Sequence, residues 1–228
     1  NKTGVLLYER NTRLTLQGIE SVKNFGLLGL YILEPAEPVP PMTEEDLDFE
    51  RFQTMAVFSI REELDNIIAG REPVNLKRLA NAIITNYGRL DHKITFTQNL
   101  RSTTDYVYKH VINTAILCAL ISAQVYYTPT EQEELVLAAL LHDIGKLLLP
   151  NKVREKYDDY DTNDLIIVKK IQNDGLGLLR PEIGIDSGVR RIVAQIHRME
   201  YGNSNLEQGK ILKSTKILTV SYTHLRAH

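Results

Sequence analysis

Apolar residues recur three or four positions apart along most of the chain after residue 43, a spacing that predicts amphipathic helices. Thr43 with Asp46 forms a capping box, and Gly70 is a stop signal, so the first helix is expected over about 43–69. The same pattern predicts four further helices, at about 75–87, 103–126, 188–199 and from 210 to 220.

One predicted helix is apolar nearly all round and is therefore expected at the centre of the fold. It starts at a capping box of Thr130 with Glu133 and ends in His142-Asp143. The fold class expected from these patterns is mainly α, a helical bundle.

The first 34 residues have a different pattern. Two short apolar strands, at 5–8 and 30–33, flank a helical stretch at 15–25, which predicts a small α+β module at 1–34. Residues 35–42 are rich in proline, so this segment is expected to be a semi-rigid linker. Connecting helices would occupy 43–100, and the main helical domain 101–220.

Composition limits the class of protein. With 228 residues, 43% of them hydrophobic and 25% charged, the chain has the composition of an ordinary globular protein. The net charge of -2 argues against nucleic acid or anionic membranes as partners. Cys118 is the single cysteine and cannot form an internal disulfide, which favours a cytoplasmic location and a core role.

Both ends of the sequence are expected to be truncations. The chain starts without methionine, and the segment from Val220 onward resembles the in-frame translation of a sequencing-library transposon adapter. Residues 221–228 are therefore expected to be foreign to the native protein. His224 and His228 are accordingly excluded as candidate ligands.

His142 and Asp143 close an apolar stretch that begins at Leu135. A carboxylate in apolar surroundings needs a cation, a metal or several donors as partners. Lys146 follows at helical-neighbour spacing and suits a cation that holds a phosphate near a metal. The plainer alternative is that Asp143 caps the next turn and that Lys146 is a solvated cation at the helix end.

His110 is the candidate partner of this pair. Only a short turn separates the helix of His110 from the helix of His142, so the two helices should be antiparallel neighbours that bring both imidazoles to one level. Two imidazoles with the Asp143 carboxylate suit a divalent transition metal, with Fe or Mn preferred and Zn, Ni or Mg left open. His197 is a further candidate ligand, with an exposed helix end as its alternative interpretation.

These residues resemble a known family. His110-x-x-Asn113 followed by Leu140 to Lys146 is similar to the HD superfamily of metal-dependent phosphohydrolases, and specifically to the HD-GYP branch, whose members hydrolyse cyclic di-GMP. The resemblance implies metal ligands at His110, His142, Asp143 and His197. It also implies catalytic roles for Asp143 and Lys146, with Lys146 contacting the substrate phosphate.

The resemblance is incomplete at the second metal position that it implies. Gln172 lies in the region where the branch carries a histidine, Ile196 replaces another histidine, and Ser204-Asn205-Leu206 stands at the Gly-Tyr-Pro signature. The last ligand of the first site would be an aspartate two residues beyond Val220, at position 222. The first site therefore looks preserved and the second dismantled.

The function expected is a divergent HD-GYP-type phosphohydrolase that acts on a cyclic dinucleotide or another phosphate-containing nucleotide in bacterial signalling. One alternative is a nucleotide receptor or scaffold that has lost turnover. Another is a one-metal HD nucleotidase. A homodimer is an open option, and neither nucleic acid nor a membrane is expected as a partner.

Overall fold

Helices are the regular elements in the part of the chain that the computed structural model describes. It describes residues 12–13, 15–24, 43–90, 106–156, 159–201 and 210–226. The prediction of a mainly α protein is confirmed for these residues. The two predicted N-terminal strands, the Pro-rich segment 35–42 and Ser204 to Leu206 lie outside them, and the helix expected at 15–25 is α1 (Leu16–Asn24).

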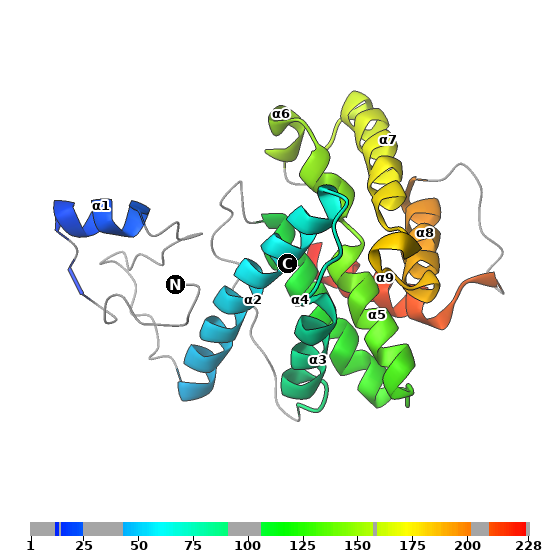
Figure 1. Cartoon of the computed structure of the whole chain (residues 1–228), viewed down its shortest axis with the longest axis horizontal. Coiled ribbons are helices and arrows are strands. Elements are labelled where there is room, and N and C mark those ends of the chain that lie inside the picture. The colour runs from blue at the N-terminus through cyan, green and yellow to red at the C-terminus, as the bar shows by residue number, and fades with distance from the viewer. Residues whose placement is uncertain are drawn as a thin grey trace.

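The main body is a bundle of helices (Figure 1). α1 is drawn at one end of the molecule. In chain order the bundle consists of α2 (Glu44–Ile68), α3 (Leu76–Tyr87), α4 (Tyr106–Gln124), α5 (Pro129–Leu141), η1 (Ile144–Leu148), α6 (Asn151–Arg154), α7 (Thr162–Leu178), η2 (Pro181–Ile183), α8 (Ser187–Tyr201) and α9 (Lys213–Arg226).

α5 occupies the centre of the bundle, as its apolar sequence predicts. It packs against α3, α4, α8 and α9, and every residue from Leu135 to Leu141 is buried. A helix that is hydrophobic on all sides is stable in water only when neighbours cover all of its faces. The residues that follow Leu141 therefore emerge inside the protein.

The start and end of α5 differ from the sequence prediction. The capping box is formed by Thr128 and Glu131, whose backbone N–H groups each donate to the other's side chain. Pro129 fits the first helical position because its fixed backbone angle suits a helix start and its missing N–H costs nothing there. The predicted box of Thr130 with Glu133 was wrong, and the helix ends at Leu141 rather than at Asp143.

The caps of α2 agree with the prediction. Thr43 accepts from the backbone N–H of Asp46, and the Asp46 carboxylate accepts from the backbone N–H of Thr43. Gly70 follows the helix with a φ of 72°, a left-handed conformation that glycine adopts without steric cost. The two ends of α2 are thus determined by local sequence.

α4 is the helix among the described residues that is long and apolar enough to cross a membrane by length and composition. Of its most apolar 18-residue window, 67% is buried inside the bundle. Its Cys118 is fully buried, and this burial raises the pKa of the thiol to about 12. Packing against the other helices therefore accounts for the apolar character of α4.

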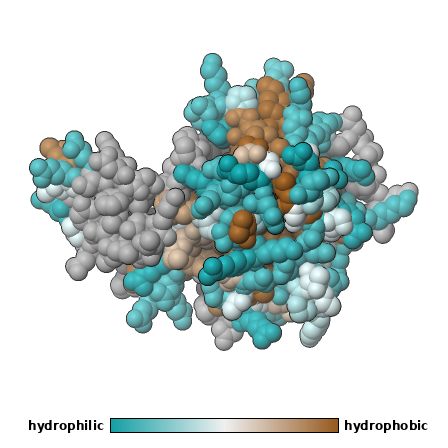
Figure 2. Space-filling view, viewed as in Figure 1, coloured by the Kyte–Doolittle hydropathy of each residue, from teal (hydrophilic) through white to brown (hydrophobic). Residues whose placement is uncertain are grey.

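α7 was not among the helices predicted from apolar spacing. Leu165, Ile166 and Ile167 are exposed, whereas Asp164 and Gln172 lie on the buried face. The face shown in Figure 2 is mostly hydrophilic, with an apolar area toward the top, where α7 lies in Figure 1. The fully buried stripe of α7 therefore alternates Val168 with polar residues and Gly175, while other apolar side chains point outward, which weakens the usual helical pattern.

α7 lies against η1 through a contact between two glycines. A Cβ atom placed on Gly175 would lie 2.6 Å from the Cα of Gly145, and one on Gly145 would lie 2.7 Å from the Cα of Gln172. These distances are shorter than real Cβ contacts, so the two backbones approach closely only because both side chains are missing. This contact places Gln172 beside the residues that follow α5.

Candidate metal centre

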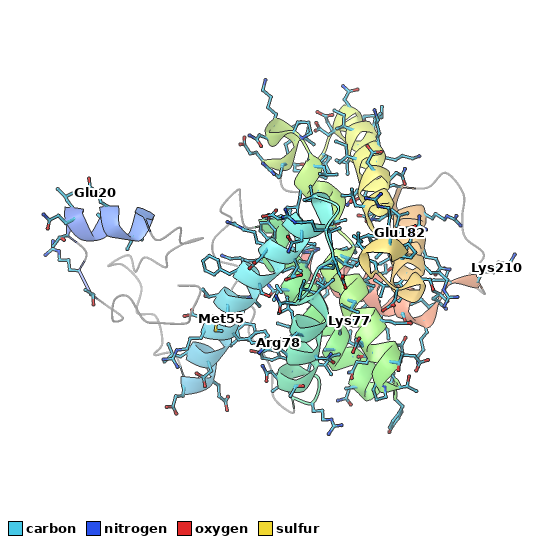
Figure 3. The ribbon with its side chains drawn as sticks, in the orientation of Figure 1. Glu20, Met55, Lys77, Arg78, Glu182 and Lys210 are labelled. Atoms are coloured by element: carbon cyan, nitrogen blue, oxygen red, sulfur yellow. The ribbon has the colours of Figure 1, made fainter. Side chains whose placement is uncertain are left out.

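Three side chains from two helix ends meet inside the bundle. His110 on α4 and His142 and Asp143 after α5 each offer a ligand atom, and these atoms lie within 4.8 Å of one another. All three residues are buried. Figure 3 labels side chains such as Met55 and Lys77 on the outer helices, which are exposed and unrelated to this cluster.

The antiparallel pairing of α4 and α5 brings the two imidazoles together, as the short connection predicts. The ring centroids of His110 and His142 are 5.4 Å apart. Their Nε2 atoms lie 3.7 Å and 3.6 Å from Oδ2 of Asp143, respectively. One carboxylate oxygen and two imidazole nitrogens therefore converge on a common region.

The change from α-helix to 3₁₀ helix lets adjacent residues share this region. His142 keeps α-helical backbone angles, but Asp143 has a φ of -107° and a ψ of 16° and precedes η1. In a continuous α-helix, successive side chains would point about 100° apart. The irregular turn is therefore part of how the site is built.

The tautomer of His142 suits metal binding. Its Nδ1 lies 2.8 Å from the backbone carbonyl of Ala139. A carbonyl oxygen only accepts, so Nδ1 carries the hydrogen in the neutral ring, and the lone pair is on Nε2, which faces Asp143. Such a carbonyl contact is the usual way in which proteins fix the orientation of a histidine ligand.

The two oxygens of Asp143 have different neighbours. Oδ2, which faces the imidazoles, also lies 2.9 Å from Nζ of Lys146. Oδ1 accepts a hydrogen bond of 2.9 Å from Nε2 of Gln172. The carboxylate thus has a cation and a hydrogen-bond donor, the partners that a buried negative charge requires.

Lys146 lies inside the protein, with only 2% of its side chain exposed. It is three residues after Asp143 along the η1 turn, close to the helical spacing expected. The alternative of a solvated cation at the helix end was wrong because the side chain is buried and lies against Asp143. A contact between Lys146 and a substrate phosphate stays a prediction.

His197 on α8 is buried and reaches the same region from the other side. Its Nε2 donates to the backbone carbonyl of His142 at 2.8 Å, so Nδ1 has the lone pair in the neutral ring. The alternative of an exposed helix end was therefore wrong. His197 is not part of the three-residue cluster, and its role as a ligand stays a prediction.

Two amide side chains support the site. Gln172 holds Asp143, and Gln53 on α2 donates to Oδ1 of Asn113 at 2.7 Å, one turn beyond His110. The sequence analysis did not single out Gln53, although a signal exists. Gln53 is a polar residue at a position of α2 whose helical neighbours Phe49 and Val57 are apolar and buried.

Residues from α8 and α9 complete the surroundings. Ile196 is 1% exposed and belongs to the apolar core, so it contributes no ligand. Tyr222 on α9 stacks against His142 with ring centroids 5.8 Å apart. The predicted position of the last ligand, residue 222, is therefore beside the cluster. Whether residues 221–228 derive from an adapter stays a prediction, and α9 includes most of them as helix.

Comparison with known proteins adds the decisive observation. The HD domain family matches residues 107–220, half of the chain, and the match contains His110, His142 and Asp143. The chain belongs to the HD domain family. No curated protein and no solved structure matches the sequence.

The residues of this HD domain fit a divalent metal. Imidazole nitrogen and carboxylate oxygen are ligands that Fe, Mn, Zn and Ni share, and three protein ligands leave coordination positions for other groups. HD domains are typically metal-dependent hydrolases of phosphate-containing substrates. The fold and the cluster together therefore form a candidate metal-dependent phosphohydrolase centre.

Proposed function

We propose that this protein is a metal-dependent phosphohydrolase of the HD-GYP type that hydrolyses a cyclic dinucleotide such as cyclic di-GMP in bacterial signalling. The observation that supports it best is the buried group of His110, His142 and Asp143 inside an HD domain. His110, His142 and Asp143 would hold the ion. When bound, such an ion activates water and orients a phosphate group.

Lys146 would provide a positive charge next to this ion. Its Nζ contacts Oδ2 of Asp143, the carboxylate oxygen that also faces both imidazoles. A phosphate oxygen that approached the ion would therefore come close to the ammonium group, which can stabilise negative charge that develops during cleavage. This arrangement favours phosphate over an uncharged substrate.

The substrate test starts with the metal. The protein is purified without oxygen, loaded with Mn²⁺ or Fe²⁺, and assayed with cyclic di-GMP, a simple phosphodiester and a set of mononucleotides. We expect turnover that requires the metal and disappears in Asp143→Ala. A transition-metal content below about a tenth of an equivalent in the wild-type protein would contradict a metal site of useful affinity.

A one-metal nucleotidase is the second candidate. It is favoured by the hydrogen bond from Gln172 to Asp143 and by the apolar residue at Ile196, since Gln172 presents an N–H to the carboxylate and isoleucine has no ligand atom. Hydrolysis of mononucleotides without hydrolysis of cyclic di-GMP would support it. Binding of cyclic di-GMP without turnover would support a receptor or scaffold instead.

A further inference from the structure

The Asp143 carboxylate has two oxygens, and a bridging carboxylate in a two-metal site uses one for each ion. In this protein Oδ2 faces His110 and His142, whereas Oδ1 accepts the hydrogen bond from Gln172. Oδ2 is thus the oxygen that lies near the Nε2 atoms of His110 and His142. The number of ions that the site can hold therefore depends on whether Oδ1 is free to bind an ion or is held by a hydrogen bond.

The orientation of the Gln172 amide follows from its partner. A carboxylate is an acceptor, so the amide atom at 2.9 Å from Oδ1 is the nitrogen, and the reversed amide would put two acceptors in contact. An amide N–H has no lone pair to offer to a cation. A second ion on Oδ1 would have to displace this N–H, and the amide oxygen, which does have lone pairs, would become a ligand only if the amide turned over.

Gln172 has little room to move aside. Its side chain is 1% exposed, and its amide oxygen would lie only 2.3 Å from a Cβ on Gly145. The Gly145–Gly175 contact fixes the backbone on both sides of this amide. Displacement would also leave a buried amide without its carboxylate partner, which is costly.

We propose that Gln172 restricts the metal centre to a single ion by holding Oδ1 of Asp143. This inference rests on the proposed function, since it assumes that His110, His142 and Asp143 bind the first ion. Gln172 is then the residue that determines metal stoichiometry. A carboxylate or an imidazole at position 172 would present a lone pair to an ion next to Asp143 without any rotation of an amide, and would open a second position there.

The test measures bound Mn²⁺ per chain in the whole protein. Wild type, Gln172→Glu and Gln172→His are loaded with Mn²⁺, desalted and analysed by elemental mass spectrometry and electron paramagnetic resonance. We expect one ion and an uncoupled Mn²⁺ spectrum in the wild type, and two ions with a spin-coupled spectrum in Gln172→Glu or Gln172→His. Glutamate is nearly isosteric with glutamine, which protects the test against misfolding of the histidine variant.

Gln132→His is the matched control. Gln132 is an amide side chain on α5 that donates to the backbone carbonyl of Ala119 and to Ser122, well before His142 in the chain. This change should leave one ion. A second ion here as well would show that any added ligand produces extra binding and would overturn the assignment to Gln172.

The other outcomes separate the two proposals. Two ions in the wild type would overturn the role of Gln172 but leave the proposed function intact. One ion in the wild type and in both Gln172 variants would also overturn the role of Gln172, provided that circular dichroism shows the variants to be folded. No metal in any protein would remove the proposed function and this inference together.

Discussion

The ring of Tyr222 lies nearly parallel to the imidazole of His142, with an interplanar angle of 21° and centroids 5.8 Å apart. Position 222 therefore lies within reach of the metal centre. This is the position at which the family resemblance expects an aspartate. Tyr222→Asp should add a fourth ligand and tighten Mn²⁺ binding by at least about 10-fold, since even the outer partners of metal ligands are worth about 10–100-fold in affinity.

Titration calorimetry of Mn²⁺ into both proteins measures this effect. Tyr222→Asn is the control, because it has the same shape as aspartate without the charge, and it should bind much more weakly than Tyr222→Asp. Equal affinities of all three proteins would show that position 222 does not reach the ion.

The ion pair between Asp143 and Lys146 predicts strong coupling in stability. Asp143→Asn leaves the Lys146 ammonium group buried without that carboxylate, so the metal-free protein should lose about 3–5 kcal/mol. The double variant Asp143→Asn/Lys146→Met should recover much of this loss. Urea unfolding of the two single variants and the double variant gives the coupling energy. Additive losses would mean that the pair contributes little.

The glycine contact between η1 and α7 predicts a contrast between two substitutions. Gly145→Ala places a methyl group against the backbone of Gln172 and should destabilise the protein by about 1–3 kcal/mol, as overpacking does. Gly177→Ala on α7 is the control, because no atom lies within 4 Å of the added carbon. It should be neutral or stabilising by up to about 1 kcal/mol. Urea unfolding midpoints distinguish the two.

The Asp161 cap of α7 should make the stability of the protein depend on pH. Its carboxylate caps the helix, and the hydrogen bond from the backbone of Asp164, followed by that from Lys156, lowers its pKa from 3.8 to about 2. A lowered pKa in the folded state means that the stabilisation is complete above about pH 4 and disappears as the pH falls to about 2.

Melting temperatures of wild type and Asp161→Asn between pH 2 and 7 measure this dependence. The difference between the two proteins should be constant above about pH 4 and should vanish near pH 2. Asp159→Asn, at an exposed position two residues earlier, is the control for the loss of one surface carboxylate. A constant difference over the whole range would contradict the role of Asp161.

The sequence predicted the parts of this fold that depend on local signals. Thr43 and Gly70 bound α2, and the all-round apolar sequence of α5 predicts its central place. The convergence of His110 with His142 was also predictable, since a short turn forces two helices to be antiparallel neighbours.

Features that depend on tertiary packing could not be predicted. α7 buries Gln172 together with Val168 and exposes Ile166, and the close approach of Gly145 to Gln172 and Gly175 holds this face against η1. The burial of Lys146 likewise depends on the elements that pack around η1. The burial of a polar side chain depends on the helices that pack around it, so local sequence does not predict it.

The buried pair of Lys146 and Asp143 makes the interior of the metal-free centre electrically neutral. A divalent ion that enters therefore adds two positive charges with no counter-charge, and a phosphate dianion would restore electroneutrality. Metal and phosphate should consequently bind with positive thermodynamic linkage, each raising the affinity of the other by the same factor. Inorganic phosphate should lower the dissociation constant of Mn²⁺, and this effect should weaken in Lys146→Met, where Asp143 offsets one of the two charges of the ion and the net charge falls from two to one.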